Sequence, residues 1–362
     1  MSGTILNVFR QDAFTSVSLT EAVERNPYQP TGLGELKIFE PKPIRTKALA
    51  VEQREGRLVI VPTSARGGPP TERITEKRQA RYFECPRLAT ADTVYAAELM
   101  DVREFGTESQ MMAIQQEVGR RLNGPTGLTS NIEYTWERHR LGAIQGQLLD
   151  ADGSVLFNWF NEFGIAQPDE IGFYLNNPTP TDGALRTQCN QVVRQMARAA
   201  QGAFTNRTRV IGLCGDEFWD ELVNHPDVTK TYYNWLQAAE LRQGTAFRGG
   251  GDDANPMAAA GMVTPMLFGD IYWINYRGSD DLTSIAIPPS KVKFFPQNAP
   301  GVFTVAWAPH ANEEWMNKLG RPTYVIPIED RDRREWWRME VYSYPLHICT
   351  RPEVLLSGRA GQ

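Results

Sequence analysis

Apolar residues recur at intervals of three and four along several stretches of the chain, which is the pattern of amphipathic helices. The cleanest stripe lies in the second half, at Leu185, Cys189, Val192, Val193, Met196 and Ala200. Shorter stripes follow Asp92, follow the capping box formed by Thr107 and Gln110, and begin at Leu128 and Val228. Asp92 and the capping box are typical helix starts. We therefore expect helices over about 92–102, 107–122, 128–136, 185–200 and 228–239.

Other apolar runs are bounded by turn residues and predict strands. A first hairpin is expected over 48–61, turning at Arg54-Glu55-Gly56, and a second turns at Asp152-Gly153. The run RVIGLC predicts a buried strand, followed by a turn and a helix capped by Asp216. Strands dominate the C-terminal part, in DIYWINY, GVFTVAW, TYVIPI and RMEVYSYPL. Because helices and strands mix without a regular βαβ rhythm, the expected fold class is α+β.

Asn123-Gly124-Pro125 stands between the helical stripe that ends at Leu122 and the one that starts at Leu128. A proline inside a helix costs ~3 kcal/mol or more, and a glycine adds roughly 1 kcal/mol relative to alanine. We therefore predict a bend or short loop between about 122 and 128.

The first 47 residues are punctuated by prolines, and Pro41 and Pro43 in particular are expected to break any regular element. An extended arm of this length is expected to lie on its own domain or on a neighbour. Further along, residues 62–84 begin rich in glycine and proline and continue basic, with Arg66, Arg73, Lys77, Arg78 and Arg81. This stretch is either a solvated hairpin tip or a protruding loop that docks by charge on another surface.

The chain has 362 residues, of which 38 are basic and 43 acidic, for a formal net charge of −5. A slightly acidic chain of this kind is a poor general binder of nucleic acid or anionic membranes. No apolar run approaches the ~18 residues of a membrane span. The N-terminus has no basic segment followed by an apolar core, so we expect no signal peptide.

Candidate chemistry is sparse. The four histidines form no metal-binding motif, and the four scattered cysteines form no CxxC. His347 and Cys349 would share one face of a strand, but a zinc site needs two more ligands. Cys214 lies at a strand end before a helix, where a thiol can be activated, although no histidine base is adjacent. No phosphate-binding glycine loop is present. We therefore expect no enzyme, cofactor or metal site, and a cysteine-dependent hydrolase using Cys214 is the enzymatic alternative.

Six segments, in order along the chain, resemble one protein family. They are FRQDAFTSVSLTEAVERNPYQPTGLGELKIF, VEQREGRLVIVPTSARGGPP, KRQARYFECPRLATADTVYAAELMDVREFG, HRLGAIQGQLLDADGSVLFNWFNEFG, LCGDEFWDELVNHPDV and PLHICTRPEVLL. With these, the chain resembles the major capsid protein E family, the lambda-type shell proteins of tailed double-stranded DNA phages. One departure concerns the spine helix of that family, which is continuous, whereas Asn123-Gly124-Pro125 falls inside it here.

The resemblance implies the tailed-phage capsid fold of the Hong Kong 97 type. It places an N-terminal arm at 1–45, an extended hairpin loop at 46–84, a peripheral domain with the spine helix at 85–180 and 333–362, and an axial domain at 181–332. The basic residues of the extended loop, from Arg66 to Arg81, become candidate contacts with adjacent subunits. The break at 123–125 becomes a kink in the spine.

The resemblance also implies a function and partners. The chain would assemble through hexamers and pentamers into the icosahedral shell around the phage genome, after synthesis in the cytoplasm of the bacterial host. Its main partner would be itself, with scaffold, portal and decoration proteins as further candidates and packaged DNA bound non-specifically at most. No membrane or small-molecule partner is expected. A tail or connector protein of the same particle is the structural alternative.

Overall fold

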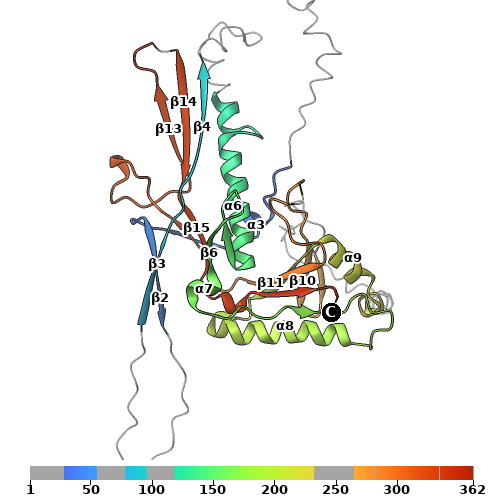
Figure 1. Ribbon diagram of the computed structural model, residues 1–362. Helices are drawn as coiled ribbons and strands as arrows, with labels where there is room; N and C mark the ends of the chain where they lie inside the picture. Colours follow the sequence, from blue (N-terminus) through green and yellow to red (C-terminus); the bar gives the residue numbers. More distant parts are fainter. Residues whose placement is uncertain are drawn as a thin grey trace, which may run out of the picture.

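The computed structural model describes residues 28–54, 78–95, 118–231, 265–281, 283–333 and 335–361. Two parts stand out in Figure 1: a wide base built on a six-stranded sheet, and a narrow extension built on a three-stranded sheet with a long helix. A ribbon of two strands leaves the molecule on the opposite side from that extension.

The six-stranded sheet, here called the core sheet, has the strand order β7-β16-β11-β8-β10-β9. β8 and β10 are parallel, whereas β11 is antiparallel to both of its neighbours, β8 and β16. β8 is buried from Val210 to Cys214, as expected for a strand covered on both faces. Its strands are Ile171–Gly172 (β7), Arg209–Cys214 (β8), Met266–Phe268 (β9), Ile271–Asn275 (β10), Lys291–Gln297 (β11) and Leu356–Arg359 (β16).

Two helices accompany the core sheet. α8 (Ala184–Ala200) runs along its lower side in Figure 1 and buries the apolar stripe from Leu185 to Ala200. α9 (Asp216–Asn224) follows β8 directly and packs against β10 and β11. The rings of Phe173, Phe218 and Phe294 surround Trp273, with centroid distances of 5.4 to 5.9 Å. This aromatic cluster lies in the main hydrophobic core.

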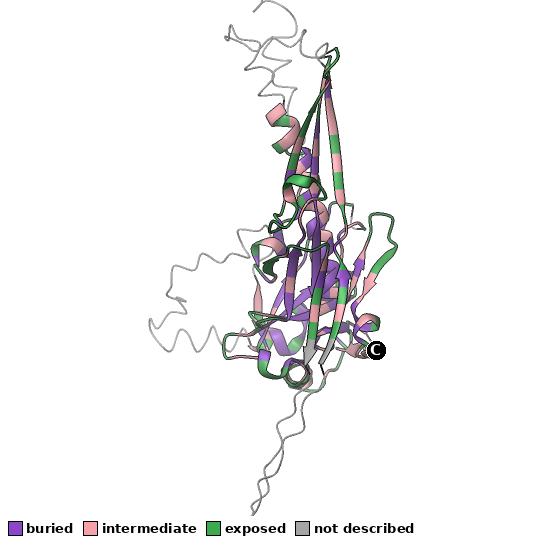
Figure 2. Cartoon of the chain, turned by 90° about the vertical axis from the view of Figure 1, so that its left-hand side faces the viewer, coloured by how far each residue is buried: buried purple, intermediate pink, exposed green. Residues whose placement is uncertain are grey.

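The narrow extension is the second part. Its sheet, here called the projecting sheet, has the order β13-β14-β4, with all neighbours antiparallel. The strands are Tyr324–Glu329 (β13), Trp336–Ser343 (β14) and Leu88–Tyr95 (β4). α6 (Leu128–Gln145) lies along one face and forms a second core with it, in which Leu128, Ile132 and Trp136 meet Met339 and Val341. Figure 2 shows buried residues gathered in the base and a mixture of buried, half-buried and exposed ones along the extension.

The helical path before α6 is interrupted. Residues 118–123 are helical, 124–127 form a turn, and α6 starts at Leu128. α6 ends at Gln145, and its C-cap is Gly146, whose φ of 86° lies in the left-handed region. A Cβ at Gly146 would also lie 2.3 Å from Cε2 of Phe160, so only glycine fits this position.

A third sheet joins the two parts. It has the order β1-β12-β15, with strands Glu40–Pro43 (β1), Phe303–Trp307 (β12) and Pro345–Cys349 (β15). Two further pairs are the ribbon of Ala48–Arg54 (β2) with Arg78–Glu84 (β3), and Gln147–Leu149 (β5) with Val155–Asn158 (β6). The short helical elements are Gly32–Glu35 (α3), Trp159–Phe163 (α7), Gln201–Ala203 (η2), Glu313–Trp315 (η3), Pro352–Val354 (η4) and residues 226–231.

Several sequence predictions are confirmed. The hairpin turning at Asp152-Gly153 is the β5–β6 pair, and the stripe at 185–200 is α8. The strand expected in RVIGLC is β8, and the four C-terminal runs contain β10 and β12 to β15. The helix expected over 107–122 lies outside the described residues up to 117, as do 96–102 and 232–239.

Four local predictions are wrong. Asp92 lies inside β4, opposite Met339, because pairing with β14 overrides its capping tendency. Arg54, expected in a turn, lies in β2 opposite Arg78 of β3, in a register that sets the buried Leu49 opposite the buried Phe83. The N-cap of α9 is Gly215, one residue before Asp216. Pro41 and Pro43 lie within β1, where both missing N–H groups fall on the edge away from β12.

The sheets also cross the expected domain boundary near residue 333. β16, from the last segment, pairs with β11 in the core sheet, and β13 pairs with β14 in the projecting sheet.

Candidate functional site

Cys214, the one candidate nucleophile, is fully buried at the end of β8. Burial raises the pKa of its thiol well above the ordinary value, and its Sγ donates to the carbonyl of Gly212 at 3.8 Å. His225 lies beyond α9, and burial lowers the pKa of its imidazole. A neutral thiol with no access to solvent is not a nucleophile. The other three cysteines are buried and unbonded as well.

His347 and Cys349 are both fully buried on β15. The ring of His347 lies 6.0 Å from that of His139 and 5.2 Å from that of Phe39. Burial lowers the pKa of His139 to about 4 and that of His347 well below its usual range. These groups are neutral packing partners. Within the described ranges, no group of three His, Cys, Asp or Glu side chains is placed to hold a metal ion.

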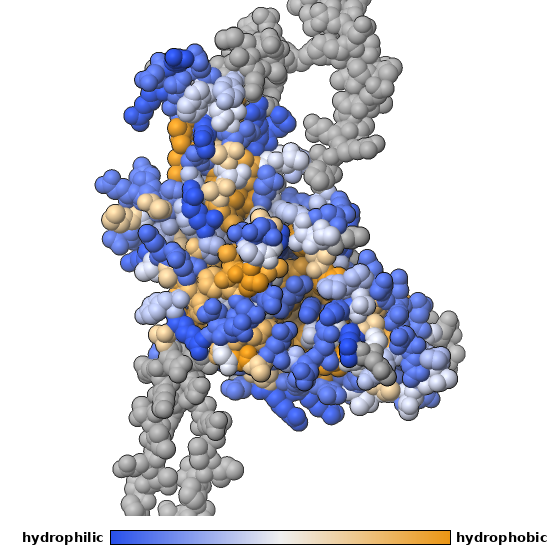
Figure 3. Space-filling model, in the orientation of Figure 1, coloured by the Kyte–Doolittle hydropathy of each residue, from blue (hydrophilic) through white to orange (hydrophobic). Residues whose placement is uncertain are grey.

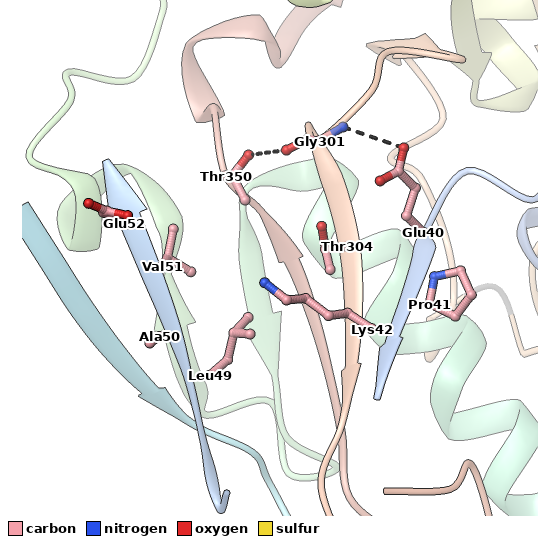
Figure 4. A pocket seen from close by; sticks show the side chains of 10 residues that line it. All are labelled: Glu40, Pro41, Lys42, Leu49, Ala50, Val51, Glu52, Gly301, Thr304 and Thr350. Atoms are coloured by element: carbon pink, nitrogen blue, oxygen red, sulfur yellow. Dashed lines mark hydrogen bonds between the residues drawn. The ribbon is translucent and has the colours of Figure 1, made fainter. Parts of the chain in front are cut away.

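An open groove of about 560 Å³ lies between β1, β2 and the start of β12. Figure 4 shows its walls, with Glu40 and Lys42 on one side and Leu49 to Glu52 on the other. The backbone N–H of Gly301 donates to Glu40 at 3.5 Å, and Thr350 Oγ1 donates to the Gly301 carbonyl at 2.6 Å. The lining alternates polar and apolar side chains without a convergent polar set. Such a groove can contact an extended segment of protein better than it can enclose a small molecule.

The β2–β3 ribbon is anchored firmly at its base. Phe83 packs edge-on against Trp159 and Phe157, with ring centroids 5.6 and 6.0 Å away. The guanidinium of Arg81 lies 5.6 Å from the ring centroid of Phe163 in its own chain. Arg66, Arg73 and Lys77 lie outside the described residues, and only the backbone of Arg78 is described, opposite Arg54.

The turn before α6 is held by defined hydrogen bonds. Gly124 N–H donates to the Arg120 carbonyl at 2.7 Å, and Ser130 Oγ donates to the Gly124 carbonyl at 2.8 Å. Thr129 Oγ1 donates to Asn123 Oδ1 at 3.2 Å. A Cβ on Gly124 would lie 2.3 Å from the Arg120 carbonyl oxygen. The break at Asn123-Gly124-Pro125 is therefore a well-defined turn held by hydrogen bonds.

One buried carboxylate, Glu137 on α6, ties three parts of the chain together, and sequence reasoning missed it. Its side chain is fully buried. It accepts hydrogen bonds from the backbone N–H groups of Leu33 at 2.6 Å and Gly34 at 3.2 Å, from Tyr276 Oη at 3.3 Å, and from Arg140 Nη1 at 3.0 Å. We call these five residues the Glu137 junction.

The junction provides hydrogen-bond donors to a carboxylate that is buried away from water. Burial raises the pKa of Glu137, while Arg140 and the donors of Leu33 and Tyr276 act in the opposite direction. The four donors explain why a carboxylate is kept in this core. The junction fixes residues 33 and 34, close to the N-terminal end of the described chain, against both α6 and the loop that follows β10.

None of these features is a catalytic constellation. Among the described residues, no helix has the length and apolar content needed to cross a bilayer. The distinctive features are extended elements: a ribbon, a projecting sheet, an open groove and a docked N-terminal segment.

Comparison with known proteins gives a consistent result. Residues 15–360 match the family described as phage major capsid protein E. The chain is 23% identical over 366 residues to the major capsid protein of Salmonella phage Felix O1 (isolate Felix O1-VT1), with 96% of each chain covered. It is 23% identical over 292 residues to the major capsid protein of Pseudomonas phage KPP10, covering 78% of this chain and 79% of that protein.

A similar fold occurs among solved structures. A prophage protein of E. coli CFT073, described as a capsid protein, superposes with a TM-score of 0.52 at 13% sequence identity. The superposition covers 98% of this chain and 96% of the other. Similarity over the full length at this identity shows a shared fold.

Proposed function

The chain belongs to the phage major capsid protein E family, and from this premise we propose that it assembles through hexamers and pentamers into the closed icosahedral shell around a double-stranded DNA genome. As a member, it is a structural component of a virion with the tailed-phage capsid fold, and it is not an enzyme. Capsid proteins associate with copies of themselves. The family match over 15–360 is the observation that carries the proposal.

The physical properties of the chain fit a shell subunit. Its extended elements offer large surface for repeated contacts with neighbours. Its net charge of −5 suits a wall that should not bind packaged DNA tightly. All four cysteines are buried, so their thiols are not available at the surface for contacts between subunits.

We assign the four expected regions as follows. The arm ends near residue 45, the extended loop is the ribbon and its tip over 46–84, the peripheral domain contains α6, and the axial domain contains the core sheet. We propose β13 as part of the peripheral domain and β16 as part of the axial domain, a division supported by the pairing of β13 with β14 and of β16 with β11.

The segment between β2 and β3, which contains Arg66, Arg73 and Lys77, is proposed to dock together with Arg78 on acidic surface of an adjacent subunit. Arg81 lies nearer the anchored base and packs on its own Phe163. Scaffold, portal and decoration proteins are proposed as further partners, and the host cytoplasm as the place of synthesis.

The turn at Asn123-Gly124-Pro125 is proposed to set the direction of the spine helix. Its hydrogen bonds favour one fixed angle over a hinge that changes with lattice position. Comparing the angle between 118–123 and α6 at hexamer and pentamer positions tests this. Different angles in different subunits would support a hinge instead.

The test of the main proposal is assembly. The full chain is expressed with the scaffold and protease genes of its phage, if these exist, and the lysate is examined by sedimentation and electron microscopy. Closed particles of uniform size are expected. A folded monomer that forms no particle under any of these conditions would overturn the proposal. Tubes or rings alone would favour a tail or connector role.

A further inference from the structure

The two faces of the projecting sheet differ in how far the rest of the chain covers them. The strand register places Val94, Met339 and Val341 on the face that packs on α6. Neighbouring residues along each strand therefore point to the opposite, outer face. On that face lie Tyr324, Ile326 and Ile328 of β13, together with Trp336, Arg338, Glu340 and Tyr342 of β14 and Tyr95 of β4.

The half of the outer face nearest the base is covered by the chain itself. The loop over 309–323 places the ring of His310 4.8 Å from that of Tyr342 and the ring of Trp315 4.9 Å from that of Tyr324. The guanidinium of Arg321 lies 4.8 Å from the centre of the Trp315 ring. Aromatic and cation–π contacts thus hold this loop over the base of the outer face.

The half nearest the tip has no such cover among the described residues. Here Tyr95 is 49% exposed, Ile328 is 37% exposed, and the side chain of Arg338 is 48% exposed. Ile326 and Trp336 are half-buried beside them, with Trp336 directly opposite Tyr95 and Ile328 directly opposite Arg338. We call these five residues the outer patch. Figure 3 shows apolar residues reaching the surface along this narrow part of the molecule.

The edge of β13 limits how another chain can bind. Among the described strands, β13 pairs with β14 alone. Pro327 lies in the middle of β13, opposite Met339, and has no N–H to offer a further strand. A proline on an edge strand opposes backbone pairing. The outer patch is therefore suited to contact through side chains, not to the addition of a strand.

We propose that the outer patch is covered by a second copy of this chain in the assembled particle, an inference that rests on the proposed function. Trp, Tyr and Arg are the residue types that dominate binding energy at protein interfaces, and the patch contains one of each beside two isoleucines. The loop over 309–323 already covers one half of the outer face, and a partner bound to the outer patch would bury the other half.

Charge at the tip of the sheet supports the same partner. Arg331, Asp332, Arg333 and Glu335 lie in or beside the turn between β13 and β14, and all four are exposed. Their side chains form no salt bridge within the described parts of the chain, although Arg333 attracts the carboxylate of Asp330 at the start of the same turn. The turn thus carries charges of both signs close together, and such a surface can be self-complementary, since a cation of one copy can meet an anion of another around a symmetry axis.

The experiment uses the four buried cysteines as a silent background for thiol labelling. Ile328→Cys and Tyr95→Cys are prepared separately in the full chain and labelled with a maleimide, both in particles freed of other proteins and in dissociated subunits. Val155→Cys, a 54% exposed position on β6 outside the patch, reports how much particle formation slows the reagent in general. Labelling of both patch variants is expected to slow by about tenfold in particles, corresponding to about 1.4 kcal/mol of local opening.

Equal labelling rates in particles and in subunits would overturn the proposal. Protection that appears only when another virion protein is present would also overturn it, because the cover would then be a different partner. Ile328→Asp gives a second measurement: it should leave the thermal unfolding of subunits unchanged and reduce particle yield about tenfold. If the unsubstituted chain forms no particles, the proposed function itself fails, and that result is separate from any result on the patch variants.

Discussion

The core sheet and the projecting sheet bury their residues in different ways. In the core sheet β8 is buried at every position after Arg209, and β11 is buried at Val292, Phe294, Phe295 and Pro296. In the projecting sheet β14 alternates between buried and more exposed positions, and β13 is buried only at Tyr324. The core sheet is completed by its own chain, whereas the projecting sheet is covered by α6 on one face and only partly on the other.

The contrast separates residues that are buried within the folded subunit from residues that become buried only on assembly. A sheet that its own chain completes draws its stability from within the subunit, so substitutions there affect folding. A sheet left half covered gains the remaining burial from another molecule, so substitutions there affect assembly and leave the isolated subunit nearly unchanged. The expected effects below rank the two regions on this basis.

The largest effect is expected at Trp273. Trp273→Ala removes a fully buried ring and the hydrogen bond from its Nε1 to the Phe268 carbonyl at 3.0 Å. A loss of about 3–5 kcal/mol is expected in the free energy of unfolding of unassembled subunits. Trp336→Ala in the projecting sheet, the matched control, should cost at most about 1 kcal/mol. Urea unfolding measures both, and similar losses would remove the distinction between the sheets.

The next effect concerns the Glu137 junction, between the two regions. Glu137→Ala leaves the backbone donors of Leu33 and Gly34 and the Arg140 guanidinium without their partner. We expect a loss of about 2–3 kcal/mol, since hydrogen bonds to a buried charge are involved. Residues near 33 should also become more sensitive to limited proteolysis. Glu137→Gln keeps the shape and should lose less, and an unchanged proteolytic pattern in Glu137→Ala would contradict the assigned role.

Low pH should lower the free energy of unfolding through His139 on α6 and His347 on β15. The pKa of His139 is lowered to about 4 by burial, against ~6.5 for an exposed histidine. Between these values the unfolded chain binds a proton that the folded chain does not, so stability present at pH 7 is lost as the pH falls. One such group removes about 2 kcal/mol between pH 7 and pH 5, and His347 acts in the same direction. His139→Leu should reduce the slope of unfolding free energy against pH, and an identical slope would exclude this role.

The smallest effect per contact is expected for the basic residues between β2 and β3 and at the start of β3. Exposed ion pairs are worth ~0–1 kcal/mol each, but a shell repeats them in every subunit. Reversing the charge at Arg73 and Arg78 together should leave subunit unfolding unchanged and lower particle yield at low salt. The deficit should shrink at high salt, where charges are screened. Equal yields at low salt would identify the segment between β2 and β3 as a solvated loop.

Much of the fold follows from the apolar pattern, and the errors have physical causes. α8 and β8 were predictable because each buries a regular stripe or run. Asp92 misled because local capping preference is weaker than pairing with a strand almost 250 residues away in sequence. The partner of β2 is β3, more than twenty residues further along the chain. It was missed because a local turn signal does not show which apolar residues of two strands will face each other. β11 and β16 were missed because lysines and a glycine interrupt their runs.

The candidate functional surfaces were harder to predict. Glu137 and Arg140 are three residues apart on a helix, the spacing of an ordinary solvated ion pair. Only the tertiary structure brings Leu33 and Tyr276 to the same carboxylate. The outer patch likewise needs the register of three strands, because Tyr95, Ile328 and Trp336 belong to separate segments.

The Glu137 junction has a consequence for the order of events in folding. Its bonds to Leu33 and Tyr276 join residues separated by 104 and 139 positions in the chain. Contacts across such separations require long loops to close, and they form slowly compared with the turns of α6. The junction is therefore expected to form after the folding transition state. Glu137→Ala should speed unfolding and leave the folding rate nearly constant, so a newly made subunit would complete its local elements first and dock its N-terminal segment last.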